Sequence, residues 1–263
     1  MSNATTPAKS RSGEAPGPLL FSWGARALFV GASLRLSPHR NAVAVLALGL
    51  DAPFTLSNDD GEVRCRSVLI EPSSLHHLRT DAGRMAFLYV DGLSRDLEVL
   101  RSAFLHVGRT ASIGHRDEEP LVTRLRALAD RTATFAATRT YLEERLQTAH
   151  RVDVADGVAA SIRYLHAHAS ERPTLADLAR RARLSPSRYR HRFVALTGVP
   201  FRRYRTWIAM GAAMRHLARG GSLTEAALEA GFASSAHFST SFRSMFGLPP
   251  SRLQNAMIRR EAG

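Results

Sequence analysis

The side chains with the clearest chemical potential lie in the segment "LSPSRYRHRF", residues 184–193. Tyr189 and Phe193 are four residues apart, so in a helix they share one face and suit a buried core. Ser187, Arg190 and His191 then project from the opposite or lateral face. Arginine can bind a guanine edge through two hydrogen bonds, and histidine can donate to or accept from a purine N7. Two further arginines flank this stripe at positions suited to phosphate: Arg188 and Arg192.

A second group of candidate ligands lies nearer the N-terminus. The segment "EPSSLHHL" (71–78) faintly resembles the end of a cupin motif, P-x-G-x-x-H, because it keeps the proline and His77 but has Ser74 in place of the glycine. A transition metal needs three or four nitrogen or oxygen ligands. The segment "HRN" offers His39 and then Asn41, and no glutamate follows within the next ten residues. The set is incomplete, so we predict no metal and no cofactor, with His76 and His77 as ordinary loop histidines.

Other signs of catalysis are missing from the sequence. It shows no glycine-rich phosphate loop and no pair of carboxylates at a telling spacing, and Cys65 has no evident catalytic partner. We therefore predict no catalytic residue, and a strand position for Cys65. A single cysteine excludes an internal disulfide framework and suits a reducing cytoplasm. No run of 18 apolar residues occurs, so we expect no membrane span.

The positive charge is concentrated in the C-terminal part. The chain of 263 residues has a net charge of +13. Residues 152–263 hold 17 arginines, no lysine and 7 acidic residues, a balance of +10, whereas residues 1–151 hold 19 basic and 16 acidic residues, a balance of +3. A polyanion would relieve the self-repulsion of such a region. A solvated basic surface with no partner is the alternative.

The pattern of apolar residues divides the chain into parts. Residues 1–18 lack large apolar side chains and carry three prolines, which is typical of a disordered leader. Residues 19–114 contain short apolar segments separated by turn signals, and they predict a small antiparallel β-domain. The segments are "RALFVGASLRL", "AVAVLALGL", "RSVLIEP" and "MAFLYVDG". With the helices that follow, the predicted cupin-like sensor or dimerisation domain spans 19–149, and 150–157 is the expected linker.

Residues 118–149 have helical periodicity that breaks near Arg139. Their apolar stripe consists of Leu121, Leu125, Leu128, Phe135, Leu142 and Leu146. An apolar stripe must be covered. From the pattern alone it either packs on its own β-domain or joins two copies of the chain.

The C-terminal part contains an internal repeat. Residues 174–201 align with 222–250 at an offset of 48, which becomes 49 after one inserted residue. Each copy begins with a hydroxyl residue and an acidic residue three positions later, the pattern of a helix-starting capping box. Each also carries aromatic residues four apart and ends with a glycine, which stops the helix, two residues before a proline. The matched positions are Thr174 with Ser222, Asp177 with Glu225, Tyr189 with Phe238, Phe193 with Phe242, Gly198 with Gly247 and Pro200 with Pro249.

Between the copies, "PFRRYRTWIAMGAAMRHLARG" (200–220) has helical periodicity. Twenty helical residues span about 30 Å, close to the ~34 Å between successive major-groove faces on one side of DNA. At this point residues 158–255 resemble the DNA-binding domain of AraC/XylS-type transcriptional regulators. The resemblance rests on both repeats, including Gly-Phe, His-Phe and Phe-Gly in "SLTEAALEAGFASSAHFSTSFRSMFGLPPSRL". It implies an all-α domain over 158–260, with two helix–turn–helix units joined by a long helix, and thus an α+β protein overall.

The resemblance also assigns the residues that would touch DNA. Base contacts are expected at Ser187, Arg190, His191, Ala236, Ser239 and Thr240. Phosphate contacts are expected at Arg188, Arg192, Arg202, Arg203 and Arg243. Related sequences commonly carry arginine where Thr240 and Ala209 stand, so we expect the second unit to read bases less strongly than the first.

The sequence thus favours a sequence-specific transcription regulator in the cytoplasm, with double-stranded DNA as its partner. The family admits RNA polymerase and a small-molecule effector as further partners, and it favours a homodimer formed through 118–149. Two alternatives stay open: a cupin-type enzyme with a DNA-binding appendage, and an architectural DNA binder that responds to no ligand.

Overall fold

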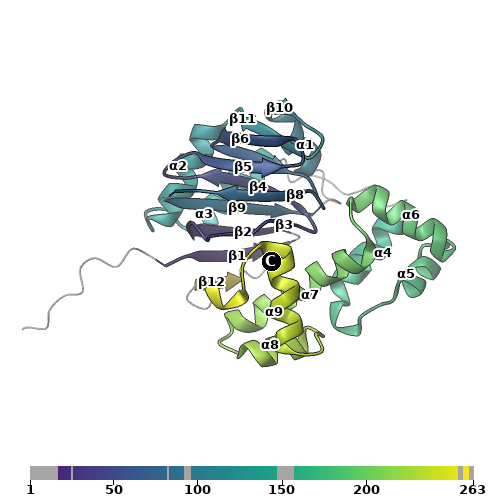
Figure 1. Cartoon of the computed structure of the whole chain (residues 1–263). Helices are drawn as coiled ribbons and strands as arrows, with labels where there is room; N and C mark the ends of the chain where they lie inside the picture. The colour runs from purple at the N-terminus through teal and green to yellow at the C-terminus, as the bar shows by residue number, and fades with distance from the viewer. Residues whose placement is uncertain are drawn as a thin grey trace, which may run out of the picture.

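The computed structural model describes residues 17–24, 26–81, 83–91, 96–146, 157–253 and 257–260. A β-rich part, residues 17–146, is called here the β-domain, and helices form the C-terminal part beside it (Figure 1). This arrangement confirms the expected fold class. Most of the predicted leader (1–16) and of the predicted linker (150–156) lies outside the described residues.

Two sheets form the β-domain (Figure 1). The larger sheet has the order β10 (Phe104–Val107), β11 (Ala111–His115), β7 (Ser67–Ile70), β4 (Ala44–Gly49), β9 (Arg84–Val90), β2 (Arg26–Ala32), β1 (Leu19–Trp23) and β12 (Met257–Arg260). The smaller sheet has the order β3 (His39–Arg40), β8 (Leu75–Arg79), β5 (Phe54–Asn58) and β6 (Gly61–Cys65). Pairing is antiparallel except between β1 and β12, which run parallel. The predicted apolar segments are β2, β4, β7 and β9, and Cys65 ends a strand as expected.

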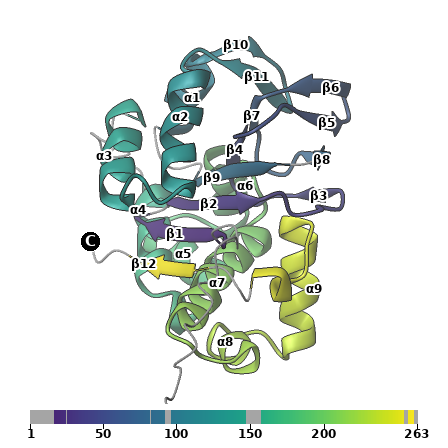
Figure 2. The same ribbon diagram turned by 90° about the vertical axis from the view of Figure 1, so that its left-hand side faces the viewer.

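Both faces of the central strands are covered, which explains why every residue of β4 is buried. Helices α1 (Asp96–Ser102), α2 (Glu118–Ala129) and α3 (Phe135–Leu146) cover one face (Figure 2). The side chains of Leu46 and Leu88 belong to the core on this side. Those of Val45 and Phe87 belong to a second core on the other face. A strand buried on both faces needs a nearly continuous apolar sequence, as "AVLALG" provides.

The apolar stripe of 118–149 packs within the chain. Its leucines and Phe135 are buried in the same core as the sheet, and the Phe135 ring stacks on Phe21 with centroids 3.8 Å apart. The stripe therefore packs on its own β-domain, one of the two alternatives that the pattern left open, and the homodimer expected through 118–149 stays a prediction. The helical break also differs from the prediction. It lies between α2 and α3, where Arg131 adopts a positive φ of 61°, and Arg139 is inside α3.

The C-terminal helices follow the repeat closely. They are α4 (Gly157–Ala167), η1 (Ala169–Glu171), α5 (Leu175–Arg181), α6 (Pro186–Thr197), α7 (Phe201–Ala218), α8 (Leu223–Glu229), α9 (Ser235–Phe246) and η2 (Pro250–Leu253). Reciprocal capping boxes join Thr174 to Asp177 and Ser222 to Glu225. Left-handed Gly198 and Gly247 end α6 and α9. Local hydrogen-bonding chemistry thus sets these boundaries. Among the described residues, no helix has both the length and the apolar character to cross a bilayer.

The β-domain and the C-terminal helices share one core, which the sequence did not predict. Met210 of α7 and Phe238 of α9 belong to the same cluster as the strands of the second sheet face. Tyr89 of β9 lies against Trp207 and Phe246, with ring centroids 5.6 and 5.7 Å away. By contrast, α4, α5, α6 and the start of α7 have a core of their own. The second helix–turn–helix unit therefore shares its apolar core with the β-domain, whereas the apolar core of the first unit is separate.

Polar contacts also cross between the two parts. Ser37 donates through its backbone N–H to the carbonyl of Gly247 at 2.8 Å. The Tyr204 hydroxyl of α7 donates to the buried carboxylate of Asp91, which follows β9. Nε2 of His166, at the end of α4, lies 2.8 Å from that hydroxyl and 3.3 Å from Asp91. One buried carboxylate thus connects the β-domain to both α4 and α7.

His39 and His76 are buried in the β-domain. The expectation that His76 and His77 lie in a loop is corrected, because both are on a strand. His76 and His77 lie on β8, and His76 is buried against His39 with ring centroids 4.3 Å apart. Burial lowers the pKa of His39 to about 4 and that of His76 to about 3. In the folded protein both side chains are therefore neutral at ordinary pH. Within the described residues no group of three or more His, Cys, Asp or Glu side chains is arranged to hold a metal.

These lowered pKa values predict a loss of stability in mild acid. Unfolded histidines bind protons near pH 6.5, whereas His39 and His76 stay neutral in the fold until about pH 4 or below. The contribution of the two neutral histidines to the free energy of unfolding is fully present above pH 6.5. As the pH drops below that value, the free energy of unfolding should fall by about 1.4 kcal/mol per pH unit for each histidine. Urea unfolding between pH 7 and 5 measures the slope. His39→Gln with His76→Gln should flatten it relative to His106→Gln, an exposed control; equal slopes would contradict the prediction.

Candidate nucleic-acid interface

The first helix–turn–helix unit, α5 and α6, presents a fixed recognition helix. Ser185 caps α6 and accepts from the Arg188 N–H at 3.3 Å, with Pro186 as the first helical residue. Tyr189 and Phe193 are fully buried. The Tyr189 hydroxyl lies 2.8 Å from the Ser161 hydroxyl of α4, which satisfies both buried groups. Helix α6 is thus held by its core face and its first turn, so its outer face has a defined orientation.

The outer face of α6 carries the side chains predicted to meet bases. Ser187, Arg190 and His191 are exposed on it, as are Arg188 and Arg192 at its flanks. Within the described part of the chain, Arg188 and Arg190 have no acidic partner. Because an unpaired arginine keeps all its donors available, this face is suited to acceptor atoms on bases and phosphates. The structure therefore brings together all the candidate residues of the first unit.

The second unit, α8 and α9, repeats this construction with a less polar outer face. Ser234 caps α9, and Phe238 and Phe242 are buried as their spacing predicts. The predicted base-reading positions of this unit are exposed except for Ser239, which is half-buried, and Arg243 is exposed one turn later: Ala236, Ser239, Thr240 and Arg243. An alanine, a serine and a threonine offer short reach and few donors. The geometry is therefore present, but its hydrogen-bonding capacity is lower than that of α6.

The turns of the two units differ at one equivalent position. Arg183 in the first turn and Gly231 in the second both have positive φ, at 55° and 88°. Only glycine adopts this region without steric cost. Arg183 is exposed, so its strained backbone is a local feature of the turn.

We predict opposite effects for substitutions at these two positions. Arg183→Gly should stabilise the protein by about 1 kcal/mol by relieving left-handed strain. Gly231→Ala should destabilise it by about 1–2 kcal/mol for the same reason, and its Cβ would lie 2.2 Å from Cζ of Arg172. Equilibrium denaturation of the two variants tests the pair. A destabilised Arg183→Gly would show that the arginine side chain makes a stabilising contact in the turn.

The predicted phosphate-binding arginines do not all face solvent. Arg202 is exposed on α7, but Arg203 is half-buried and donates from its guanidinium to the backbone carbonyl of Arg40 in the β-domain. Burial, together with the nearby charge of Arg40, lowers the pKa of Arg203. We therefore remove Arg203 from the predicted phosphate contacts, because its side chain connects α7 to β3.

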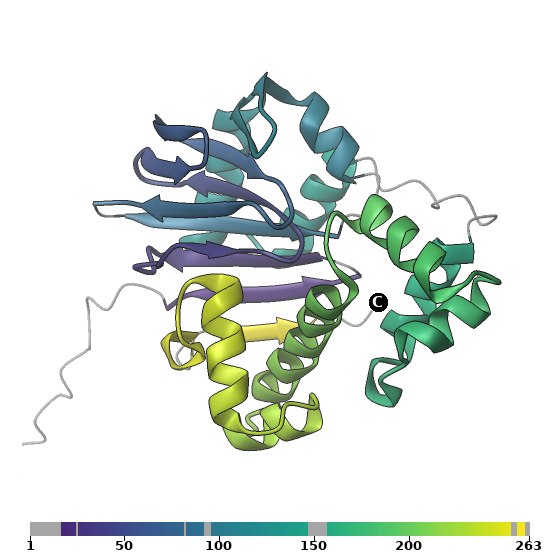
Figure 3. The same ribbon diagram turned by 45° about the vertical axis from the view of Figure 1, so that its right-hand side comes forward.

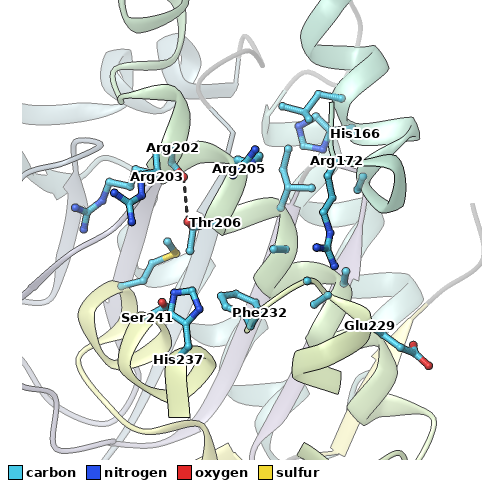
Figure 4. Close-up of a pocket in the computed structure, with 18 of the residues that line it drawn as sticks. His166, Arg172, Arg202, Arg203, Arg205, Thr206, Glu229, Phe232, His237 and Ser241 are labelled. Carbon is cyan, nitrogen blue, oxygen red and sulfur yellow. Dashed lines mark hydrogen bonds between the residues drawn. The ribbon is translucent and has the colours of Figure 1, made fainter. Parts of the chain in front are cut away.

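A hollow of about 790 Å³ lies between the two units (Figure 4). Its lining residues come from the end of α4 with η1, from one face of α7, and from the turn and inner side of the second unit. Figure 3 shows the ribbons of these C-terminal helices beside the β-domain. Basic side chains from all three walls line it: His166, Arg172, Arg202, Arg203, Arg205, Arg215 and His237. Glu229 is the acidic residue on its wall, and its carboxylate lies 2.7 Å from Nδ1 of His216. Sequence reasoning missed Arg172, because it follows a short helix outside both repeats.

Known proteins are similar to this chain in the helix–turn–helix region and in the overall fold. Residues 178–256 match the family model described as a helix-turn-helix domain. The C-terminal region is an AraC-type helix–turn–helix domain. No curated protein matches the chain. The whole fold is similar to the crystal structure of ToxT from Vibrio cholerae O395, with 14% identity over 88% of this chain and 97% of that chain and a TM-score of 0.57.

Two other solved structures are similar to parts or most of the chain. One is unsaturated fatty acid bound wild-type ToxT from Vibrio cholerae strain SCE256, with 14% identity over 87% of this chain and 94% of that chain and a TM-score of 0.55. The other is the DNA-binding domain of AdpA in complex with a target DNA, with 26% identity over 38% of this chain and 91% of that chain and a TM-score of 0.35. The similarity to ToxT shows that the β-domain and the helical C-terminal part together form a known fold.

Proposed function

We propose that the protein is a sequence-specific DNA-binding transcriptional regulator that reads two adjacent major-groove segments. One observation carries this proposal. The helix α7 joins two helix–turn–helix units. The recognition helix of each unit is capped at both ends, packs on its own aromatic pair and exposes its predicted base-reading side chains, apart from the half-buried Ser239. The 18 residues of α7 span about 27 Å at 1.5 Å per residue. Such a unit fits successive major-groove faces along one side of DNA.

The composition of the two recognition helices predicts how the site is divided. The first unit exposes Arg190 and His191, whereas the second carries a half-buried Ser239 and an exposed Thr240 at the equivalent places. Sequence information in the DNA site should therefore be concentrated in the half bound by the first unit, because the longer arginine and histidine side chains discriminate bases by hydrogen bonds that the short hydroxyl side chains of serine and threonine make less specifically. The second half should contribute phosphate contacts and apolar contacts with thymine methyls.

Selection of bound sites from random DNA tests both statements. The full-length protein should enrich one sequence motif with unequal information in its two halves. Equal information in both halves would show that the second unit reads bases well. Enrichment of no motif, with affinity that only falls steeply with salt, would instead identify an architectural DNA binder.

The shared core suggests a role for the β-domain within this function. Any ligand that alters the packing of β9 against α7 and α9 would also alter the position of the second unit, because Tyr89, Trp207 and Phe246 are in mutual contact. We include in the proposal that the β-domain is a sensor whose small-molecule effector acts through this contact. ToxT, which has the same fold, has been crystallised with an unsaturated fatty acid. We also propose a cytoplasmic location, which suits a chain whose single cysteine is buried and forms no disulfide.

A further inference from the structure

The hollow between the two units has a strongly positive lining. Arg172, Arg202 and Arg205 are exposed on its walls, and none has a carboxylate partner within the described part of the chain. Glu229, on the same wall, lies beside His216 and is 3.9 Å from Arg219. A concave surface with this charge concentrates field lines and attracts anions more strongly than a flat one. The charge is therefore suited to a ligand with several negative groups.

Arg172 has an unusual conformation that places it in this hollow. Its φ is 50°, a left-handed value that is uncommon for a residue other than glycine. Its N–H donates to the Ala169 carbonyl at 3.3 Å, which closes the 3-10 turn η1 and holds this conformation. Such strain is maintained only where the surrounding structure imposes it, and it is often found at functional positions.

The guanidinium of Arg172 reaches from the end of η1 to the second unit. It lies over Gly231, in the turn of the second unit, so closely that a Cβ there would be 2.2 Å from Cζ and 2.3 Å from Nη2. The absence of a side chain at Gly231 makes room for the arginine. Arg172 therefore lines the hollow between η1 and the second unit, and Arg205 lines the same hollow from α7.

The position of the hollow relative to α7 identifies its occupant. The opposite side of α7, with Met210 and Ala213, is buried in the core shared with the β-domain. DNA that meets both recognition helices must therefore cross α7 on the open side, over the hollow. Between two successive major-groove segments the minor groove faces the protein, bordered by the phosphates of both strands. The small side chains of Ala209 and Ala212 form part of the floor and leave depth for a backbone.

We propose that this hollow binds the phosphodiester backbone midway between the two major-groove segments, with Arg172, Arg202 and Arg205 as its phosphate ligands. This inference rests on the proposed function, and it adds a third DNA contact that belongs to neither recognition helix. A free phosphorylated compound would have the same chemistry, so the test separates the two sources.

The test uses the full-length protein and the site obtained by selection. Arg172→Gln and Arg205→Gln should each weaken binding roughly three- to tenfold for all sequences alike and lower the salt slope by about 0.9, the value for one lost phosphate contact. Arg64→Gln, an exposed arginine on β6 that lies away from the hollow, is the matched control and should change neither quantity. Unchanged affinity and slope in both hollow variants would overturn the proposal.

A second arm locates the contact on the DNA. Neutral methylphosphonate linkages placed midway between the two half-sites should weaken wild-type binding, and Arg172→Gln should then cause little further loss. Additive losses, or no effect of the neutral linkages, would overturn the proposal. Pyrophosphate is titrated into the protein without DNA as the third arm. Tight binding that depends on Arg172, with no effect of the central linkages, would assign the hollow to a free phosphate compound instead. If the wild-type protein selects no DNA sequence, the proposed function itself fails.

Discussion

Arg190→Ala is expected to remove most of the base preference at one position of the DNA site, at a cost of about 1–3 kcal/mol for the preferred base. The reason is geometric. Arg190 is exposed on a helix whose opposite face is locked by Tyr189 and Phe193, so its guanidinium begins from a fixed backbone position. A bidentate contact to guanine depends on that fixed position, because both hydrogen bonds must form together. Quantitative binding to a set of single-base variants of the selected site measures the effect.

Arg188→Ala is the matched control on the same helix. Its side chain is also exposed, but it lies beside the base-reading stripe. It should weaken binding to all variants of the site equally and lower the salt slope by about 1. If Arg190→Ala instead gave the same specificity profile as the wild type, Arg190 would not be a base-reading residue. Loss of folding is not expected in either case, since both side chains are exposed.

The C-terminal helices could be predicted from the sequence because their boundaries depend on local chemistry. Thr174 and Asp177 are three residues apart and satisfy each other's backbone N–H groups wherever the chain turns into a helix. Gly198 ends a helix because it can adopt a left-handed conformation, and this too needs no distant partner. The exposed faces of α6 and α9 then follow from helical geometry once the aromatic residues are placed in the core.

The contacts between the two parts could not be predicted, since they depend on tertiary positions. Asp91 and Tyr204 are 113 residues apart, and nothing near either residue indicates that one becomes the buried partner of the other. Arg203 resembles its neighbour Arg202 in sequence, and only the approach of β3 to α7 separates an interdomain contact from a solvent-facing arginine. A charged residue near a predicted interface is therefore assigned to that interface too readily from the sequence alone.

The apolar stripe of α2 and α3 shows the same limit and leads to the second large effect. Helical periodicity predicts that an apolar face is covered, but it does not say whether the same chain or a second copy covers it. Leu125 and Leu128 are 1% and 2% exposed and pack against the sheet of their own chain. Leu125→Glu with Leu128→Glu should therefore unfold the β-domain. Each substitution removes a buried leucine and inserts an unpaired carboxylate, a loss of about 3–5 kcal/mol or more per site, against a total stability of about 5–15 kcal/mol.

The consequence should spread unequally through the C-terminal helices. The second unit shares a core with the β-domain, so α8 and α9 should lose most of their protection from hydrogen exchange in the double variant. The first unit has a separate core around Tyr189, Phe193 and Tyr204, and α5 and α6 should retain more of theirs. Thr123→Glu, an exposed change on the same helix α2, should leave the whole pattern unchanged. A double variant that kept its unfolding midpoint and halved its molecular mass in light scattering would instead show that the stripe joins two copies. The buried positions of Leu125 and Leu128 favour unfolding, because a side chain enclosed by its own domain cannot also form the contact surface of a dimer.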